Sequence, residues 1–302
     1  MTIKFIIPIL LTVVLCFYIF APECKLKDAE AVQLSKKFCK LVNASVDSEP
    51  WVLSSKKGSI NSTDEVKEVV VGPRGTFKLS IDIGCKDKQI KMFQNIGVRD
   101  YVFLKYHISR DNRKARQWPQ ALSENKAKEL LFQKANLIGL PPDVKFKSII
   151  LDKQYNGVWI ATWVRTLNSF PYENDFVSIS IMAIDGELFS YNRFFSGEPC
   201  PTKVKVSENA AKEIAKRKIQ SILSQKNALN YIVASTDLKI VQPNAFLGIF
   251  TPFSRHKSRL AWVFRFNRYI GANNIAEGNL PDFIIIKVDA ATGKVIGGKS
   301  AK

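Results

Sequence analysis

Histidine is scarce in this 302-residue chain, in which only His107 and His256 occur. Neither belongs to a metal-binding motif, and the sequence contains no His-Glu-x-x-His, Cys-x-x-Cys, Gly-x-Ser-x-Gly, phosphate-binding loop or dinucleotide-binding glycine pattern. These absences argue against the metallopeptidases, serine hydrolases and nucleotide-dependent enzymes that depend on such motifs. The sequence therefore predicts no catalytic residue, no metal site and no cofactor.

Acidic residues are the second shortage. The chain has 27 Asp and Glu against 45 Lys and Arg, which gives a formal net charge of +18. A surface this basic attracts polyanions such as nucleic acid, anionic lipid headgroups and acidic wall polymers. The hydrophobic fraction of 46% is that of an ordinary globular protein, and the length allows about two domains at roughly 100–200 residues each.

Residues 1–22 contain one long apolar run. Lys4 is followed by uncharged residues from Phe5 to Ala21, a helical length of roughly 26 Å at about 1.5 Å per residue. This is near the short limit for crossing a bilayer and slightly long for the core of a signal peptide. Because bulky Ile19 and Phe20 make a poor cleavage site, we expect an uncleaved membrane anchor, with a cleaved signal peptide as the alternative. Either one exports the remaining chain, the second as a secreted or periplasmic form.

Four cysteines lie beyond the apolar run. They can form two disulfides with three possible connectivities, and burial as free thiols is an equal alternative. The sequence leaves the pairing open for Cys24, Cys39, Cys85 and Cys200.

A pattern of helix, Trp-Val strand and hairpin occurs three times. The helices are expected from apolar spacing, and the strands from alternation of apolar residues. The expected helices are 28–43, 123–139 and 207–224, and the Trp-Val pairs begin at Trp51, Trp163 and Trp262.

The expected hairpins cover 75–93, 176–195 and 283–298. In the second, Asp185-Gly186 predicts a type I′ turn, because such turns need positive φ at both central residues. Asp82, Asp185 and Asp289 recur at the hairpins, and we interpret them as turn residues rather than as a shared acidic site.

The repeated pattern predicts an α+β fold of tandem units, each with a helix packed on an antiparallel β-sheet. Turn-rich stretches set the expected boundaries: an N-terminal segment over 1–22, a degenerate α+β unit over 23–117, and two more regular units over 118–200 and 201–302.

Three stretches of the last unit, "SENAAKEIAKRKI", "LAWVFRF" and "FIIIKVDAATGKVIGG", resemble the PepSY family in combination and order. The unit at 118–200 matches more loosely and the first barely. The resemblance implies tandem cystatin-like units of exported bacterial proteins. Some family members are propeptide segments of thermolysin-type metallopeptidases, and a modulatory role toward peptidases is inferred for others. The family has no catalytic residues to carry over.

Basic residues cluster between Thr251 and Gly271, where no acid occurs and aromatic residues interleave. The aromatic residues at alternating positions are expected in the core and the charges on a solvated face. Another basic face is expected on the third helix, opposite Ile214 and Ile219. The candidate anion-binding residues are Arg255, Lys257, Arg259, Arg265, Arg268, Lys212 and Lys216.

These features favour a non-enzymatic, exported or membrane-tethered PepSY-like protein that binds or modulates another envelope protein, a peptidase being one candidate. The first alternative is a basic envelope module that binds anionic polymer or lipid headgroups. A hydrolase with an unrecognised site is the second alternative. Nucleic acid is disfavoured as a partner because the chain is expected to be exported.

Overall fold

The computed structural model describes residues 24–44, 46, 48–57, 65–72, 78–98, 100, 121–152, 157–223, 225–246, 257–269 and 280–301. The expected N-terminal anchor, both histidines and Arg255 lie outside the described residues. Among the helices that the structure describes, none is long and apolar enough to span a bilayer.

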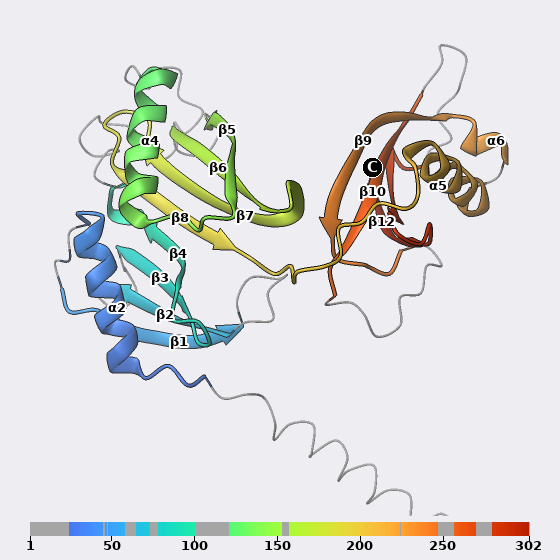
Figure 1. Cartoon of the computed structure of the whole chain (residues 1–302). Coiled ribbons are helices and arrows are strands. Elements are labelled where there is room, and N and C mark those ends of the chain that lie inside the picture. The colour runs from blue at the N-terminus through green and yellow to red at the C-terminus, as the bar shows by residue number, and fades with distance from the viewer. Residues whose placement is uncertain are drawn as a thin grey trace, which may run out of the picture. The chain divides into compact units, whose positions relative to one another are not determined.

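The described residues form an α+β fold with twelve strands and four helices. A helix followed by four strands occurs three times along the chain (Figure 1). The first group is α2 (Asp28–Leu41), β1 (Trp51–Lys57), β2 (Glu65–Val71), β3 (Leu79–Gly84) and β4 (Ile90–Asn95). The second is α4 (Glu124–Ile138), β5 (Val144–Asp152), β6 (Val158–Leu167), β7 (Phe170–Met182) and β8 (Leu188–Phe194). The third is α5 (Glu208–Ile222), short α6 (Gln225–Ala228), β9 (Tyr231–Val241), β10 (Arg259–Arg268), β11 (Phe283–Asp289) and β12 (Val295–Ala301).

The chain divides into two compact units, and the second helix-and-strand group contributes to both. The first unit comprises the described residues of Met1–Leu122, Lys153–Val158 and Ile181–Tyr191. The second comprises those of Ser123–Asp152, Trp159–Ser180 and Asn192–Lys302. The expected boundaries near residues 117 and 200 stay a prediction.

In the first unit, α2 packs on the antiparallel strands β1 to β4 (Figure 1). Asp28 and Glu30 begin the helix and Lys40 lies in its last turn, as the helix dipole favours. Phe38 points into the core, where its ring centroid lies 5.3 Å from that of Phe93 on β4. Apolar burial between this helix face and the sheet therefore holds the unit together.

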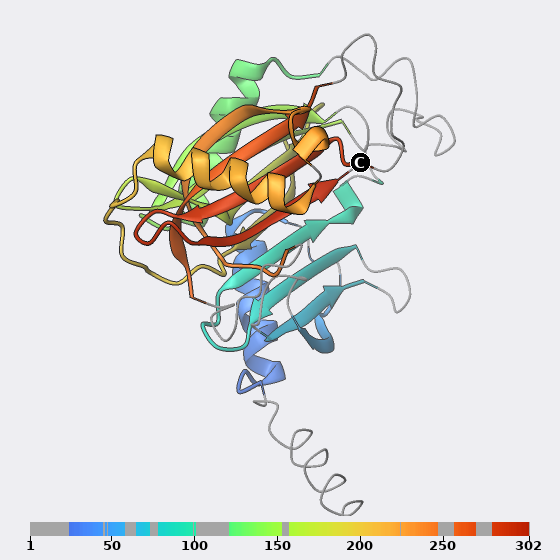
Figure 2. The same ribbon diagram turned by 90° about the vertical axis from the view of Figure 1, so that its right-hand side faces the viewer.

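In the second unit, α5 lies across one face of the sheet formed by β9 to β12 (Figure 2). The Ser207 hydroxyl caps the helix by accepting from the Ala210 N–H at 3.3 Å. The buried residues of α5 follow one face at a spacing of four, as the sequence predicted. They are Ala211, Ala215 and Ile219, and they pack on Tyr231, Phe264, Phe266, Ile284, Ile286 and Val288.

Trp163 and Trp262 occupy the second strand of their groups and both lie on the side of the helix. The Trp163 ring centroid is 5.6 Å from that of Phe132 on α4, and Trp262 packs against the α5 core. Trp51 differs, because it lies on β1, the first strand of its group. The expected equivalence of the three Trp-Val pairs is therefore restricted to the second and third groups.

The last two strands of each group are joined by the same kind of turn. In each turn, the N–H of the first residue donates to the carbonyl of the residue five positions later. The carbonyl of the first residue accepts from the N–H of the residue four positions later, and all these bonds measure 2.8–3.0 Å. The residue before the closing position has positive φ. In the order first, positive-φ and closing residue, the three turns are Gly84, Lys88 and Gln89 in the first group; Met182, Gly186 and Glu187 in the second; and Asp289, Gly293 and Lys294 in the third.

Two turn predictions are wrong. Asp185-Gly186 does not form a type I′ turn, because only Gly186 has positive φ and the loop holds four residues rather than two. Asp82 is not a turn residue either: it lies buried within β3. In that hairpin Asp87 takes the turn position, where its carboxylate accepts from the Gln89 N–H at 3.1 Å.

The residue after each turn's first residue ties the hairpin to the rest of its group. Its N–H donates to a backbone carbonyl at the start of the group's second strand, or just before that strand. In two groups its own carbonyl accepts from a backbone N–H of the segment before the helix. In the first group a disulfide makes the corresponding connection to the segment before the helix. These residues are Cys85, bonded to Cys24; Ala183, bonded to Gly157 and Leu122; and Ala290, bonded to Leu260 and Val206.

The cysteine pairing left open by the sequence is thus resolved. Cys24 and Cys85 form a disulfide with a Cα–Cα distance of 5.2 Å. Cys39 is a buried free thiol in α2, and Cys200 is a half-buried free thiol.

Burial of Cys39 predicts a loss of stability in alkali. Burial raises the pKa of its thiol from 9.0 to about 11. Because the folded state then holds this proton more tightly than the unfolded state, the free energy of unfolding falls as pH rises from 9 towards 11. We expect the wild type to lose about 1–3 kcal/mol more than Cys39→Ala over this window. Urea unfolding of both proteins at several pH values measures the difference, and parallel pH curves would contradict the assignment.

Candidate functional site: the basic surface and the Arg165 cluster

Three of the predicted basic residues on and beside β10 are exposed, but they are spread out. Arg259 and Arg265 lie on β10, on the side away from α5, since the intervening Phe264 faces the helix. They are six positions apart, or roughly 20 Å along a strand. Lys257, just before the strand, is also exposed.

Two of these arginines already have partners within the chain. The Arg265 guanidinium carbon lies 4.2 Å from the centroid of the Phe283 ring, and its Nε donates to Asn267 at 2.9 Å. Arg268 is half-buried and donates to the Leu280 carbonyl at 3.1 Å. Arg265 keeps an exposed charge on an aromatic platform, whereas Arg268 stabilises the local backbone.

The predicted basic residues of α5 lie on the other side of the same sheet. Lys216 is exposed and pairs with Glu213 at 2.8 Å, a hydrogen bond that lowers the pKa of the Glu213 carboxyl. Lys212 is half-buried. The six predicted residues that the structure describes therefore do not form one patch, and anion binding by either face stays a prediction.

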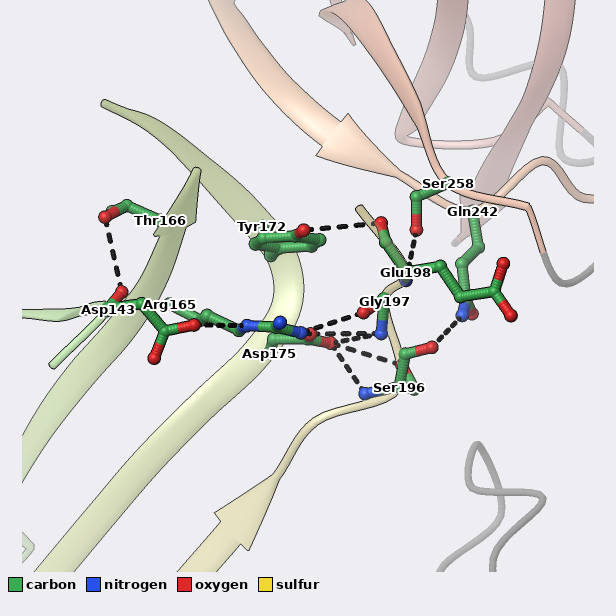
Figure 3. Close-up of polar contacts among 10 residues, drawn as sticks. All are labelled: Asp143, Arg165, Thr166, Tyr172, Asp175, Ser196, Gly197, Glu198, Gln242 and Ser258. Atoms are coloured by element: carbon green, nitrogen blue, oxygen red, sulfur yellow. Dashed lines mark hydrogen bonds and ion pairs between the residues drawn. The ribbon is translucent and has the colours of Figure 1, made fainter. Parts of the chain in front are cut away.

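An extensive polar cluster of the second unit surrounds Arg165 (Figure 3). Arg165 lies on β6, and its Nε donates to Asp143 at 2.8 Å. Its Nη1 donates to the Asp175 carboxylate at 3.1 Å and to the Gly197 carbonyl at 2.8 Å. One guanidinium thus connects two acids to the segment that follows β8.

Asp175 on β7 also holds the same segment. Its carboxylate, only 2% exposed, accepts from the backbone N–H groups of Ser196 and Gly197, each at 3.0 Å. Gly197 packs so closely that an added Cβ would lie 2.4 Å from a ring carbon of Tyr172. The backbone at this position therefore requires glycine.

The surroundings of Arg165 favour its charged form. Burial lowers the pKa of Arg165, but the hydrogen bonds that its guanidinium donates to Asp143 and Asp175 outweigh this effect and raise the pKa above its ordinary value. Burial also raises the pKa of Tyr172, against the opposing effect of the Arg165 charge. The guanidinium lies 4.7 Å from the centroid of the Tyr172 ring, a cation–π contact.

The third helix-and-strand group supplies further contacts to this segment. Gln242 donates to the Ser196 carbonyl at 2.8 Å, and the Ser258 hydroxyl accepts from the Glu198 N–H at 2.9 Å (Figure 3). The cavity among these residues measures only ≈ 10 Å³, so it holds about one water at most. The cluster consequently fixes the backbone of residues 196–198 and leaves no room for a ligand.

A larger hollow of ≈ 450 Å³ lies in the first unit. Its charged lining residues have opposite signs, Lys78 and Glu187, and Asn43 and Asn95 add amide groups. The volume is within the range of small-molecule sites, but the lining selects no particular ligand charge. Within the described ranges, no group of three His, Cys, Asp or Glu residues could hold a metal ion.

Sequence reasoning missed the Arg165 cluster. Its members come from different strands and from a linker, and no short motif places Asp143, Arg165 and Asp175 together. The only available signal was a charged residue in the otherwise apolar strand "VWIATWVRTL", which requires a partner when half-buried.

No family model matches the chain, and no curated protein matches it in sequence. Among solved structures, the Bacillus megaterium YpeB C-terminal domain is similar at 15% identity and a TM-score of 0.44, over 92% of this chain and 99% of that chain. An uncharacterized protein from Eubacterium rectale is similar at 12% identity and a TM-score of 0.49, over 90% of this chain and 82% of that one. These values support no statement about activity or partners.

Proposed function

We propose that the chain is an exported, membrane-tethered PepSY-like protein of tandem cystatin-like modules, which binds or modulates another envelope protein without catalysing a reaction. A peptidase is one candidate partner. One observation carries the proposal. The buried polar groups of Arg165 and Asp175 bind backbone atoms of the chain itself, whereas large apolar side chains on strands are exposed and available to a partner.

The exposed apolar side chains support a protein partner. Ile232 on β9 is 55% exposed, and Tyr269, just after the adjacent end of β10, is 62% exposed. Tyr269 donates its N–H to Asn230, next to exposed Leu229. Neighbouring exposed apolar residues of this kind are typical of surfaces that bind other macromolecules.

Export is supported by two features near the N-terminus. The apolar run of residues 5–21 is followed directly by Cys24, whose disulfide with Cys85 suits an oxidising compartment outside the cytoplasm. The tandem arrangement is supported by the same turn, which joins the last two strands of all three groups. The resemblance of the last hairpin to the PepSY family also supports it.

Chemical cross-linking of the full chain in envelope membranes, followed by identification of captured proteins, tests the proposal. We expect one protein partner whose capture weakens far less with added salt than capture of polymer or lipid would, because apolar contacts are not screened. Peptidase activity in the extract is then compared with and without the chain.

Binding of anionic polymer or lipid is the second candidate function, favoured by the exposed charge of Arg265 on its aromatic platform. It predicts association that weakens steeply with salt. Capture of polymer or lipid alone, lost on adding salt, would replace the protein-binding proposal.

A further inference from the structure

The first strand of a helix-and-strand group presents its outer edge for pairing. In the third group this edge receives another strand of the chain, because Tyr172 of β7 pairs with Ile240 of β9 in parallel. In the second group β5 pairs with β6 alone among the strands that the structure describes. The outer edge of β5 is thus the counterpart of an edge that already accepts a strand elsewhere in this unit.

The side chains of β5 differ in character between its two faces. Phe146 faces α4, with its ring centroid 5.1 Å from that of Phe132, yet it stays 38% exposed. Ile150 lies on the same face by strand alternation and is 56% exposed. Exposed Lys145 and Lys147 alternate with them on the opposite face.

We propose that the outer edge of β5 binds an extended, acidic segment of a partner protein by strand addition. An apolar side chain of that segment contacts Phe146 and Ile150, while its carboxylates pair with Lys145 and Lys147. The inference rests on the proposed protein-binding function and assigns part of that binding to the edge of β5.

The charges of the edge select this occupant over a second copy of the chain. Backbone hydrogen bonds give strand addition its affinity, and side chains on alternating positions give it specificity. Lys145 and Lys147 would repel the same lysines in a β5-to-β5 pairing, as edge lysines commonly do. Lys128, whose Nζ lies 5.5 Å from the Phe146 ring centroid, adds a third positive charge on the helix side.

Binding of a synthetic peptide of about ten residues that alternates Glu and Val tests the surface on the full chain. We expect saturable binding and slowed amide exchange within β5, but not within α5. N-methylation of alternate peptide residues along one edge should abolish binding, whereas methylation along the other edge should not. Equal binding of a peptide with the same residues in two blocks, or loss of binding on neither methylation, would overturn strand addition.

Charge reversal locates the site. Lys145→Glu with Lys147→Glu should weaken peptide binding at least about tenfold, and Ile150→Ala about threefold. The matched control, Lys37→Glu with Lys40→Glu on α2, makes the same change in net charge at exposed positions of the other unit. Equal weakening by the control would show charge attraction only and would contradict the assignment to β5.

The same variants separate this inference from the proposed function. If cross-linking captures a partner with wild type but not with the β5 double variant, both stand. If the β5 variant and wild type capture the partner equally, the function stands and the β5 surface is wrong. Association of wild type with anionic vesicles in place of the peptide would likewise reject a protein segment as the occupant.

Discussion

Removal of the Cys24–Cys85 disulfide is expected to lower the free energy of unfolding of the first unit by about 4 kcal/mol. The bond closes a loop across a sequence separation of 61. In the chain-entropy account, opening a loop of this length returns about that much conformational freedom to the unfolded state. The bond also connects Cys85, in the turn between β3 and β4, to the segment before α2. The other two groups make the corresponding connection with a backbone hydrogen bond.

Urea unfolding of the full chain, with amide exchange of β3 and β4 to report on the first unit, measures the effect. Cys24→Ala with Cys85→Ala should match the reduced wild type. Cys200→Ala is the control, because this half-buried thiol is free and its loss leaves the bond intact. A loss below about 1 kcal/mol in the double variant would show that backbone hydrogen bonds close this group without the bond.

Local features of the helices and strands were predictable from the sequence. Ser123 and Ser207, the first residues of the helices expected over 123–139 and 207–224, cap those helices, and Gly139, the last residue of the first range, ends α4 in the left-handed conformation. Alternation likewise assigned Phe264 and Phe266 to the core. These patterns succeed because a cap or a buried face depends on residues only a few positions apart.

Features that depend on distant residues were not predictable. Asp-Gly indicates a tight turn locally, but the strand register around Gly186 leaves four residues in the loop. The basic residues predicted on and beside β10 are close in sequence, yet the extended strand places Arg259 and Arg265 roughly 20 Å apart, and Arg268 is half-buried. The cysteine pairing required the spatial meeting of Cys24 and Cys85, which spacing alone does not give.

The Arg165 cluster also depends on distant residues, so its partners were not predictable from the sequence. A half-buried arginine predicts a partner but does not say which acid, and here Asp143 and Asp175 both serve. The cluster also makes Gly197 indispensable through the Tyr172 ring, a requirement that no turn pattern announces. Its function follows from burial: the network fixes the exit from β8, so its loss should be visible there first.

Arg165→Met is expected to lower the free energy of unfolding of the second unit by about 3–5 kcal/mol, because it leaves the Asp175 carboxylate buried without its counterion. Adding Asp175→Asn should restore about 1–3 kcal/mol, since a neutral amide needs no counterion and its oxygen still accepts from the Gly197 N–H. Urea unfolding of the single and double variants gives the coupling. Amide exchange of Ser196 and Gly197 should accelerate most in Arg165→Met.

Arg217→Met on the exposed side of α5 is the control and should change stability by no more than about 0.5 kcal/mol. The sign of the second substitution decides the interpretation. If the Asp175 carboxylate is stabilised by the backbone N–H groups of Ser196 and Gly197 alone, then Asp175→Asn weakens those bonds and destabilises the Arg165→Met protein further. If the guanidinium is the counterion that makes its burial tolerable, the double variant is more stable than Arg165→Met, which is the result we expect.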